Sequence, residues 1–275
     1  RAPFLPDVCN RIEACTKQVV AALHGTALGG GLEIALSAHY RVALNSAKVG
    51  LPEVNLGLLP GAGGTQRTPR LVGAKAALDL ILSGRHMSAV EAVKLGLIDK
   101  VVDGTDIQAA GLAYARELLA AKAPVRRTRD AIEALADREA NQAAIDAARQ
   151  DTAKKTRGLF SPGKIIDAVQ AALTQPFDEG MRIERELFMQ CMESPQRAGL
   201  IHVFFAERDV AKAPETRTAQ PRPINSVGVV GGGTMGAGIT VSMLDAGLPV
   251  IMIERDEESL ARGRNHVEKV YDMLI

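Results

Sequence analysis

The sequence has few of the residues that build nucleic-acid or membrane-surface sites. It has no tryptophan and only six phenylalanines and three tyrosines, and its 33 Lys and Arg nearly balance 32 Asp and Glu. Aromatic side chains on which bases could stack are therefore scarce, and no global field attracts polyanions. We expect neither nucleic acid nor an anionic membrane among the partners.

Cysteine and histidine are scarce as well. The three cysteines (Cys9, Cys15 and Cys191) are odd in number and lack CxxC spacing, which argues against a disulfide framework or a zinc knuckle. We interpret them as inert small hydrophobic residues in a reduced compartment. The five histidines are scattered without an HExxH motif, so we expect no metal site.

Signals for secretion or membrane insertion are weak. Residues 1–17 lack a basic stretch followed by an apolar one and a small-residue cleavage site, so we expect no secretory signal. One uncharged run, Ile224–Leu244, is long enough to span a bilayer, but six of its residues are glycine, which would weaken a spanning helix. We favour a buried strand that turns into a helix, and expect no membrane span.

Short apolar runs alternate with helical patterns in the first part of the chain. The runs Gln18–Gly25 and Tyr40–Leu44 predict buried strands, with a helix between them near Leu32–Ala38. The stretch 47–73 is rich in glycine and proline and predicts a long loop, of the kind that often frames a site.

Helical patterns dominate the middle of the chain. Ser88 and Glu91 have the spacing of a capping box and predict a short helix, which a strand follows. Residues 107–205 have helical spacing, interrupted at 160–163 (FSPG) and by Pro195, and the proline-containing stretch 208–226 predicts a linker.

Three consecutive glycines, Gly29–Gly31, stand directly before the first expected helix, and Glu33 lies almost at its start. Glycines at a helix entrance let the backbone approach a ligand closely and aim free N–H groups at it, which suits an oxyanion. For the triplet alone, a tight turn with Glu33 as an ordinary first-turn acid is the simpler interpretation. Glu33 by itself therefore decides little.

A second acid, Glu53, follows a proline in an otherwise apolar segment, where an idle carboxylate is unexpected. From Val19 to Gly73, the sequences HGTALGGGLEIALSAHYRVA and VGLPEVNLGLLPGAGGTQRTPRLVG closely resemble the enoyl-CoA hydratase/isomerase (crotonase) superfamily, with the spacing of both acids kept. The resemblance implies the ββα spiral fold of that superfamily.

The resemblance also implies roles for three residues. Gly30 would offer its N–H to the thioester oxygen of an acyl-CoA, and Glu33 and Glu53 would hold a water between them. Preorganised N–H donors stabilise the enolate charge that develops when water adds to an α,β-unsaturated thioester. Two close carboxyls titrate apart, so we assign deprotonation of the water to Glu33 and proton delivery to Glu53.

Other crotonase chemistry stays open. The same acids would also shuttle a proton between the α- and γ-carbons, as a Δ3,Δ2-enoyl-CoA isomerase does, although isomerases of the superfamily often keep only one acid. The superfamily supplies a second oxyanion amide upstream of the glycine triplet, and nothing upstream in this sequence resembles that segment. We therefore expect a fragment that lacks the first part of this domain.

A second set of glycines, Gly231, Gly233 and Gly236, forms GxGxxG behind an apolar strand, and the next apolar strand ends in Glu254. This context is typical of a dinucleotide-binding turn, in which the acid binds ribose hydroxyls and disfavours a 2′-phosphate. We expect NAD. Arg255 beside the acid leaves NADP as an alternative, and glycines that merely allow a close strand–helix crossing are the structural alternative.

Residues 231–239 resemble the start of the 3-hydroxyacyl-CoA dehydrogenase family. That family has a catalytic His–Glu pair well beyond the glycine fingerprint, so we expect neither residue in this sequence. His266 lies in a charged helical stretch, and we interpret it as a surface residue.

The two segments in this order resemble the multifunctional enzymes of fatty-acid β-oxidation. We predict an α/β protein with a crotonase-like domain (1–163, its N-terminal part missing), a linker helix region (164–222) and the start of a Rossmann-type NAD-binding domain (223–275). Hydration of trans-2-enoyl-CoA would yield a 3-hydroxyacyl-CoA, which the parent enzyme would oxidise with NAD to a 3-ketoacyl-CoA. We expect three aromatic side chains to anchor the linker helix: Phe188, Phe204 and Phe205.

Two rival functions remain. A non-catalytic acyl-CoA or NAD binding module would be expected to have lost Glu33, Glu53 or Glu254, and a crotonase of other chemistry would not need both acids of the first site. Acyl-CoA substrates are the expected partners, with a thiolase or a second copy of the parent as open candidates. We expect a cytoplasmic location for a bacterial parent and allow a peroxisomal one for a eukaryotic parent.

Overall fold

The computed structural model describes residues 4–156, 158–210, 212, 219–220 and 222–273. The chain divides into two compact units, residues 1–211 and residues 212–275. The predicted linker helix region therefore contributes its helices to the first unit. Much of the predicted linker (residues 211, 213–218 and 221) lies outside the described residues.

Among the described residues, the first unit has two small sheets, and its first four strands alternate between them. One sheet has the parallel order β1 (Val20–Leu23), β3 (Tyr40–Leu44), β6 (Lys100–Val102). The other has the order β2 (Thr26–Leu28), β4 (Lys48–Gly50), β5 (Met87–Ser88), with β5 antiparallel. A helix follows each of the first two strand pairs: α2 (Gly30–Ser37) and then α3 (Gly64–Ser83). This is the ββα repeat that the resemblance implies.

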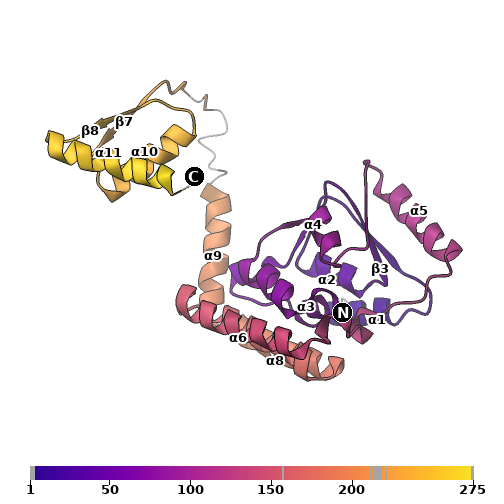
Figure 1. Ribbon diagram of the computed structural model, residues 1–275. Helices are drawn as coiled ribbons and strands as arrows, with labels where there is room; N and C mark the ends of the chain where they lie inside the picture. The colour runs from indigo at the N-terminus through magenta and orange to yellow at the C-terminus, as the bar shows by residue number, and fades with distance from the viewer. Residues whose placement is uncertain (1–3, 157, 211, 213–218, 221, 274–275) are drawn as a thin grey trace. The chain divides into compact units, whose positions relative to one another are not determined.

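The central strand β3 is buried at all five positions. Its neighbours β1 and β6 pair with it on both sides, and α5 (Ile107–Ala120) covers the sheet from outside (Figure 1). The rings of Tyr40 and Tyr114 pack edge to face in this layer, with 6.3 Å between their centroids. The strand that the apolar run predicted is thus confirmed, and it forms the middle of the sheet.

The predicted loop 47–73 is wrong in part. It contains β4, the 3-10 turn η1 (Pro52–Leu56) and the beginning of α3. Glycine and proline misled the prediction because Pro69 and Gly73 lie inside α3, where Gly73 (φ 78°, ψ 168°) interrupts the helix. The N–H of Ala74 then donates to Oδ1 of Asn141 at 2.7 Å, which caps the second half of α3.

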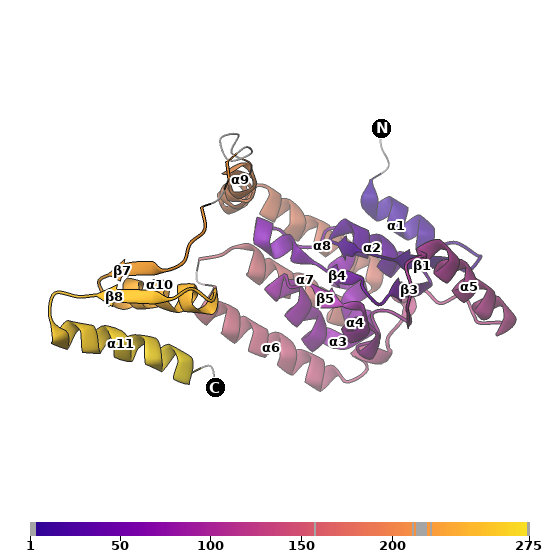
Figure 2. The same ribbon diagram turned by 90° about the horizontal axis from the view of Figure 1, so that it is seen from above.

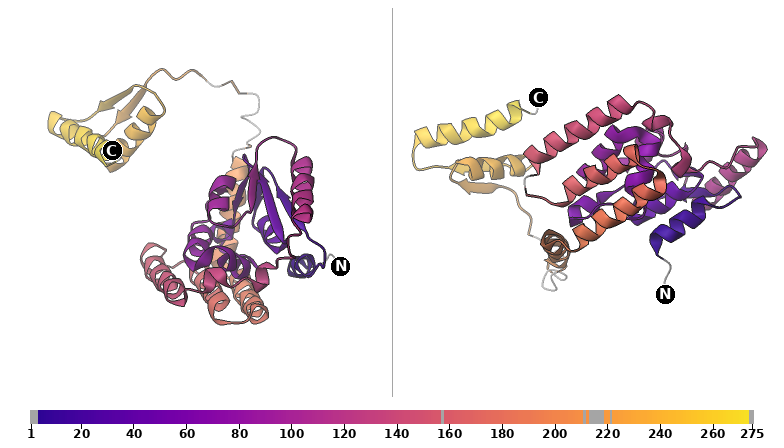
Figure 3. Two further views of the ribbon diagram at one scale, coloured as in Figure 1. Left: turned by 45° about the vertical axis from the view of Figure 1, so that its right-hand side comes forward. Right: turned by 90° about the horizontal axis from the view of Figure 1, so that it is seen from below.

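The later helices form a layer beneath α3. In Figures 2 and 3, α6 (Arg138–Lys155), α7 (Ser161–Thr174) and α8 (Phe177–Met192) run side by side, and all three contact α3. Helix α1 (Leu5–Glu13) packs on α2, and α9 (Pro195–Val210) packs on η1. Smaller elements complete the unit: α4 (Ala89–Lys94), η2 (Thr128–Asp130) and η3 (Glu133–Leu135).

Two local predictions from the sequence are confirmed. The hydroxyl of Ser88 accepts the N–H of Glu91 at 3.2 Å, so Ser88 caps α4 as expected, while the carboxylate of Glu91 pairs with Arg85 and does not complete the capping box. Cys9 and Cys191 are fully buried, and burial raises the pKa of the Cys191 thiol to about 11. This environment keeps the thiol protonated and unreactive.

The predicted aromatic anchors have mixed outcomes. Phe188 of α8 packs against the core of the first unit, above Gly61. The expectation is wrong for Phe205, which is 57% exposed, whereas Phe204 is half-buried. Adjacent helical residues point about 100° apart, so Phe204 and Phe205 cannot both face the same surface.

The described residues of the second unit form two parallel strands and two helices. Strands β7 (Val227–Val230) and β8 (Val250–Ile253) pair in parallel, with α10 (Thr234–Asp245) between them along the chain and α11 (Glu257–Asp272) after them. The long uncharged run is therefore a strand, a turn and most of a 12-residue helix. The expected burial of the strand is wrong, because only Val229 of β7 is buried and Val230 is 83% exposed. Within the described ranges, no helix combines the length and apolar character needed to cross a membrane.

Candidate active site

The acids Glu33 and Glu53 come from different elements and meet at the glycine triplet. Glu33 lies in the first turn of α2, which Gly29 caps with a positive φ of 54°. Glu53 lies on η1, and a Cβ built on Gly29 would stand 3.1 Å from its Oε1. The glycine thus allows η1 to approach the start of α2 closely.

Glu33 is buried and anchored by backbone amides. It is 3% exposed, and its Oε1 accepts the N–H of Ala62 at 2.7 Å and of Gly64 at 2.8 Å. Burial raises the pKa of Glu33, while the two amides and the guanidinium of Arg67 oppose that rise. A Cβ on Gly64 would lie 2.9 Å from Oε1, so only glycine fits at this position.

Glu53 lacks this anchoring. Its Oε2 is buried, and no group of the described residues donates a hydrogen bond to it. Burial, followed by the negative charge of Glu33, raises the pKa of Glu53 to about 8. Glu53 is therefore the protonated acid at neutral pH, with one oxygen left for a ligand.

Gly30 supplies the third feature of the site. It is the first residue of α2, where backbone N–H groups have no acceptor within the helix and the helix dipole is positive. Leu5 of α1 closes one side, since a Cβ on Gly30 would lie 2.9 Å from its Cδ2. An N–H donor beside an anchored carboxyl and a protonated one suits acid–base chemistry next to a developing oxyanion.

Sequence reasoning missed a third buried acid, Glu184 of α8. Its Oε1 accepts the N–H of Gly63 at 2.8 Å, and its Oε2 accepts the N–H and the hydroxyl of Thr65 at 3.1 Å and 2.5 Å. Burial and the charge of Glu33 raise the pKa of Glu184 to about 8. The available signal is its spacing: it lies in one buried helical stripe with Phe177, Gly180, Leu187 and Cys191, where an acid is out of place.

A buried ion pair that sequence reasoning also missed supports the same turn. Nη2 of Arg67 lies 2.7 Å from Oε2 of Glu13, and both side chains are almost fully buried. Nη1 of Arg67 donates to the carbonyl of Ala62 at 3.2 Å. The pair thus links α1 to the segment that binds Glu33.

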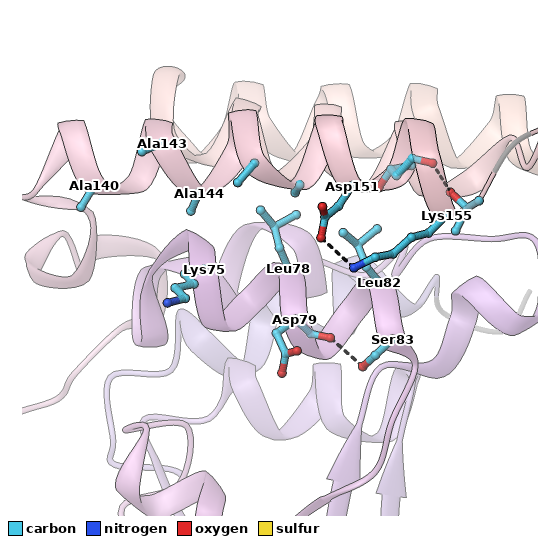
Figure 4. A pocket seen from close by; sticks show the side chains of 14 residues that line it. Lys75, Leu78, Asp79, Leu82, Ser83, Ala140, Ala143, Ala144, Asp151 and Lys155 are labelled. Atoms are coloured by element: carbon cyan, nitrogen blue, oxygen red, sulfur yellow. Dashed lines mark hydrogen bonds and ion pairs between the residues drawn. The ribbon is translucent and has the colours of Figure 1, made fainter. Parts of the chain in front are cut away.

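A groove of about 710 Å³ lies elsewhere, between α3 and α6 (Figure 4). Its walls are Leu78 and Leu82 on one side and alanines of α6 on the other, and Asp151 pairs with Lys155 at 2.9 Å on its edge. None of the predicted site residues lines it.

In the second unit, the glycine-rich turn and the acid lie together. A Cβ on Gly236 would meet the carbonyl oxygen of Gly231 at 1.7 Å, so this crossing of turn and helix requires glycine. Gly233 caps α10, and Oε1 of Glu254 accepts the N–H of Gly232 at 2.6 Å. The free amides at the start of α10 and the carboxylate beside them fit a dinucleotide.

The two remaining residues singled out in this unit have surface environments. Arg255 is exposed, and its Nε donates to Oδ2 of Asp256 at 2.9 Å, which engages the cation that suggested NADP. His266 is exposed on α11, as expected.

Comparisons with known proteins cover both units. Residues 4–158 match the family model described as enoyl-CoA hydratase/isomerase, and residues 226–275 match 3-hydroxyacyl-CoA dehydrogenase, NAD binding domain. The peroxisomal bifunctional enzyme of Danio rerio is 43% identical over 272 residues, or 97% of this chain. A peroxisomal fatty acid beta-oxidation multifunctional protein of Arabidopsis thaliana is 38% identical over 270 residues, or 98%. The chain spans 37% of the length of each of these relatives.

A crystal structure of an enoyl-CoA hydratase from Mycobacterium avium subsp. paratuberculosis K-10 is similar with a TM-score of 0.51 and 20% identity, over 80% of this chain and 71% of that one. This similarity supports the fold. Together with the family match over residues 4–158 and the ββα repeat, it confirms the predicted α/β class. The chain belongs to the enoyl-CoA hydratase/isomerase family, and its C-terminal segment matches the NAD-binding domain of 3-hydroxyacyl-CoA dehydrogenases.

Proposed function

We propose that the first unit hydrates trans-2-enoyl-CoA to 3-hydroxyacyl-CoA in fatty-acid β-oxidation, and that the full-length protein oxidises this product with NAD to 3-ketoacyl-CoA. One observation carries the proposal: Glu33 and Glu53 meet at the Gly29–Gly31 turn, where the amides of Ala62 and Gly64 anchor Glu33 while Oε2 of Glu53 has no donor among the described residues. The printed names of the relatives, which include a bifunctional enzyme and a beta-oxidation protein, support it.

In the hydration step, the N–H of Gly30 binds the thioester oxygen and stabilises the charge that develops there. An interaction of this kind typically lowers a barrier by about 3 to 4 kcal/mol. Glu33 takes a proton from water as the water oxygen bonds to the β-carbon, and Glu53 gives its proton to the α-carbon. Glu33 has then gained a proton and Glu53 has lost one, so proton exchange with solvent returns both acids to their starting states.

The second unit would hold the cofactor. The turn from Gly231 to Gly236 and the start of α10 would bind the pyrophosphate, and Glu254 would bind the ribose hydroxyls. NAD bound there would accept a hydride from the hydroxyl-bearing carbon of the acyl chain. The pairing of Arg255 with Asp256 favours NAD over NADP, because it engages the guanidinium that a 2′-phosphate would need.

The proposed chemistry suggests a partner, and the names of the relatives suggest a location. A 3-ketoacyl-CoA product is the substrate of a thiolase, so we propose a thiolase as a partner, with self-association of the full-length protein as the alternative. The names of the relatives favour a peroxisomal location if the protein is eukaryotic. A bacterial protein would be cytoplasmic.

The test uses crotonyl-CoA and the full-length protein without NAD, and follows loss of the conjugated-thioester absorbance. We expect the wild type to consume the thioester and Glu53→Gln to be slower by about a hundredfold to ten-thousandfold, because removal of a general acid costs that much. Glu186→Gln is the matched control, since Glu186 is an exposed acid of α8 that pairs only with Arg182 among the described residues.

Two other outcomes would contradict the proposal. If the wild type ignores crotonyl-CoA but converts a 3-enoyl-CoA to the conjugated 2-enoyl-CoA, the acids serve isomerisation. If neither thioester reacts while acyl-CoA still binds, the unit is a binding module.

A further inference from the structure

Four consecutive backbone amides at the start of α3 are divided between two buried acids. The N–H groups of Ala62 and Gly64 donate to Glu33, and those of Gly63 and Thr65 donate to Glu184. Every second amide thus points to the same carboxyl. The turn cannot shift toward one acid without loosening its bonds to the other, because both carboxyls bind alternate residues of a single short segment.

Glu184 is held firmly in this arrangement. It is 1% exposed, and both of its oxygens accept hydrogen bonds. Glu33 uses Oε1 for both of its amides. Among the described residues, no hydrogen bond engages its other oxygen, which leaves Oε2 for a ligand.

Charged and titratable groups of three further elements face this pair of acids. Arg67 of α3 is the cation, and Glu13 of α1 is its ion partner. The Cys9 thiol of α1 and the carboxyl of Glu53 on η1 also lie within electrostatic reach of Glu33. Since the positive charge of Arg67 is already matched by Glu13, no further cation among these groups balances two full negative charges on Glu33 and Glu184, which would repel each other.

We propose that Glu184 is a positioning residue of the hydratase site: it fixes the amide turn that orients Glu33, and it shares a single negative charge with Glu33. This inference rests on the proposed hydration reaction. Glu184 touches neither substrate nor water in this role. It acts through the turn, and through competition with Glu33 for the charge that the four amides stabilise.

The two halves of the role predict different kinetic effects. Loss of the amide bonds would misplace Glu33 and lower kcat. Loss of the second carboxyl would leave the whole charge on Glu33. Glu33 would then ionise at a lower pH, and the acid limb of the pH–rate profile would move to lower pH.

The test measures pH profiles of kcat and kcat/KM for crotonyl-CoA hydration by the full-length protein. For Glu184→Gln, we expect kcat to fall about ten- to a hundredfold and the acid limb to move down by roughly one pH unit. Glu184→Asp keeps the charge on a shorter side chain, so kcat should fall while the limb stays near its wild-type position. Glu186→Gln on the exposed face of α8 should change neither quantity.

Thr65→Val keeps the test decisive if Glu184→Gln does not fold. This variant removes the hydroxyl that donates to Glu184 and that also accepts from Nε2 of Gln66, which keeps its bond to the carbonyl of Ala168. Loss of the donated bond disfavours charge on Glu184. We expect the acid limb to move in the same direction as in Glu184→Gln, by a smaller amount.

The outcomes distinguish a failure of this inference from a failure of the proposed hydratase function. If the wild type does not hydrate crotonyl-CoA, the proposed function fails. If the wild type is active and the folded variants lose rate with no movement of the acid limb, Glu184 is only structural and the shared charge is refuted.

Discussion

At the scale of single residues, two nearby carboxyls differ in the hydrogen bonds and charges that surround them. Burial raises the pKa of Glu33, and two amide hydrogen bonds and the guanidinium of Arg67 oppose that rise. Glu53 receives no bond at Oε2 and faces the charge of Glu33, so its neutral form is favoured. These different surroundings fit the proposed roles of Glu33 as base and Glu53 as acid.

This difference predicts the basic limb of the pH dependence. The pKa of Glu53 is raised to about 8, so the proton that it delivers is present below that pH and is lost above it. We expect kcat/KM for crotonyl-CoA hydration to be high at pH 7 and to fall as the pH rises through about 8. The measurement is initial rates of the full-length protein between pH 5 and pH 10, at constant ionic strength.

Glu184 has a pKa raised to the same region, so its contribution must be separated. The Glu184→Gln variant serves as this control: if the limb belongs to Glu53, it remains near pH 8 in that variant. A limb that disappears in Glu184→Gln would contradict the assignment to Glu53.

At the scale of elements, α3 carries the site at one end and depends on a cap in its middle. Gly73 breaks the helix, and the buried side chain of Asn141 bridges the break. Its Oδ1 accepts the N–H of Ala74, and its Nδ2 donates to the carbonyls of Ala134 and Asp137 at 3.0 Å and 2.8 Å. Helix α6 is tied to α3 through this one side chain and its neighbours.

Asn141→Ala should therefore destabilise the first unit. The substitution leaves an N–H and two carbonyl groups without these partners, and an unsatisfied buried group costs about 1 to 3 kcal/mol. We expect a loss of at least that size in the free energy of unfolding, measured as a lower urea midpoint. Gln142→Ala is the control, because Gln142 is the exposed neighbour and should change stability by less than about 0.5 kcal/mol. An Asn141→Ala midpoint equal to that of the control would refute the bridging role.

Local sequence patterns predicted the elements whose signals are local. The Ser88 N-cap, the β3 strand and the strand–turn–helix of the second unit lie where short-range spacing placed them. The loop 47–73 was partly wrong because glycine has two uses: it marks turns, and it also permits close packing, as Gly64 does against Glu33. Composition alone cannot distinguish these uses.

Only the residues of the candidate site that lie in a local sequence motif were predicted. Glu33, Glu53 and Gly30 lie in one stretch of similar sequence, so the resemblance found them together. Glu184 binds Gly63 from 121 positions away, and Arg67 binds Glu13 from 54 positions away. Contacts between distant segments leave no local spacing, and only an acid within the buried stripe of α8 marked one of them.

At the scale of the whole molecule, each proposed site is built within one unit. The contacts of Glu33, Glu53 and Glu184 come from residues before 211, and those of Glu254 come from residues after 226. The predicted division at residues 163 and 222 remains a prediction about domains. Its boundary at 163 assigns Glu184 and Glu33 to different regions, although both acids bind the same turn.

This organisation predicts that the two proposed activities can be removed separately. Glu254→Ala takes away an acceptor for ribose hydroxyls and for the N–H of Gly232, so the affinity for NAD should fall about ten- to a hundredfold, since hydrogen bonds to a charged group contribute about 1.5 to 3 kcal/mol. Hydration of crotonyl-CoA should be unchanged. Glu53→Gln should do the reverse, and lose hydration while 3-hydroxybutyryl-CoA still reduces NAD. The measurement follows both reactions in the full-length protein.

The reciprocal pattern depends on charge effects that stay within each unit. Surface electrostatic effects fade over about 10 Å in ordinary salt, and neither substitution changes a residue that the other site contacts. A loss of hydration in Glu254→Ala would therefore mean that the second unit supports the first site directly. A loss of NAD reduction in Glu53→Gln would place an acid of the first unit in the oxidation step. Either result would replace two independent sites by one coupled catalyst.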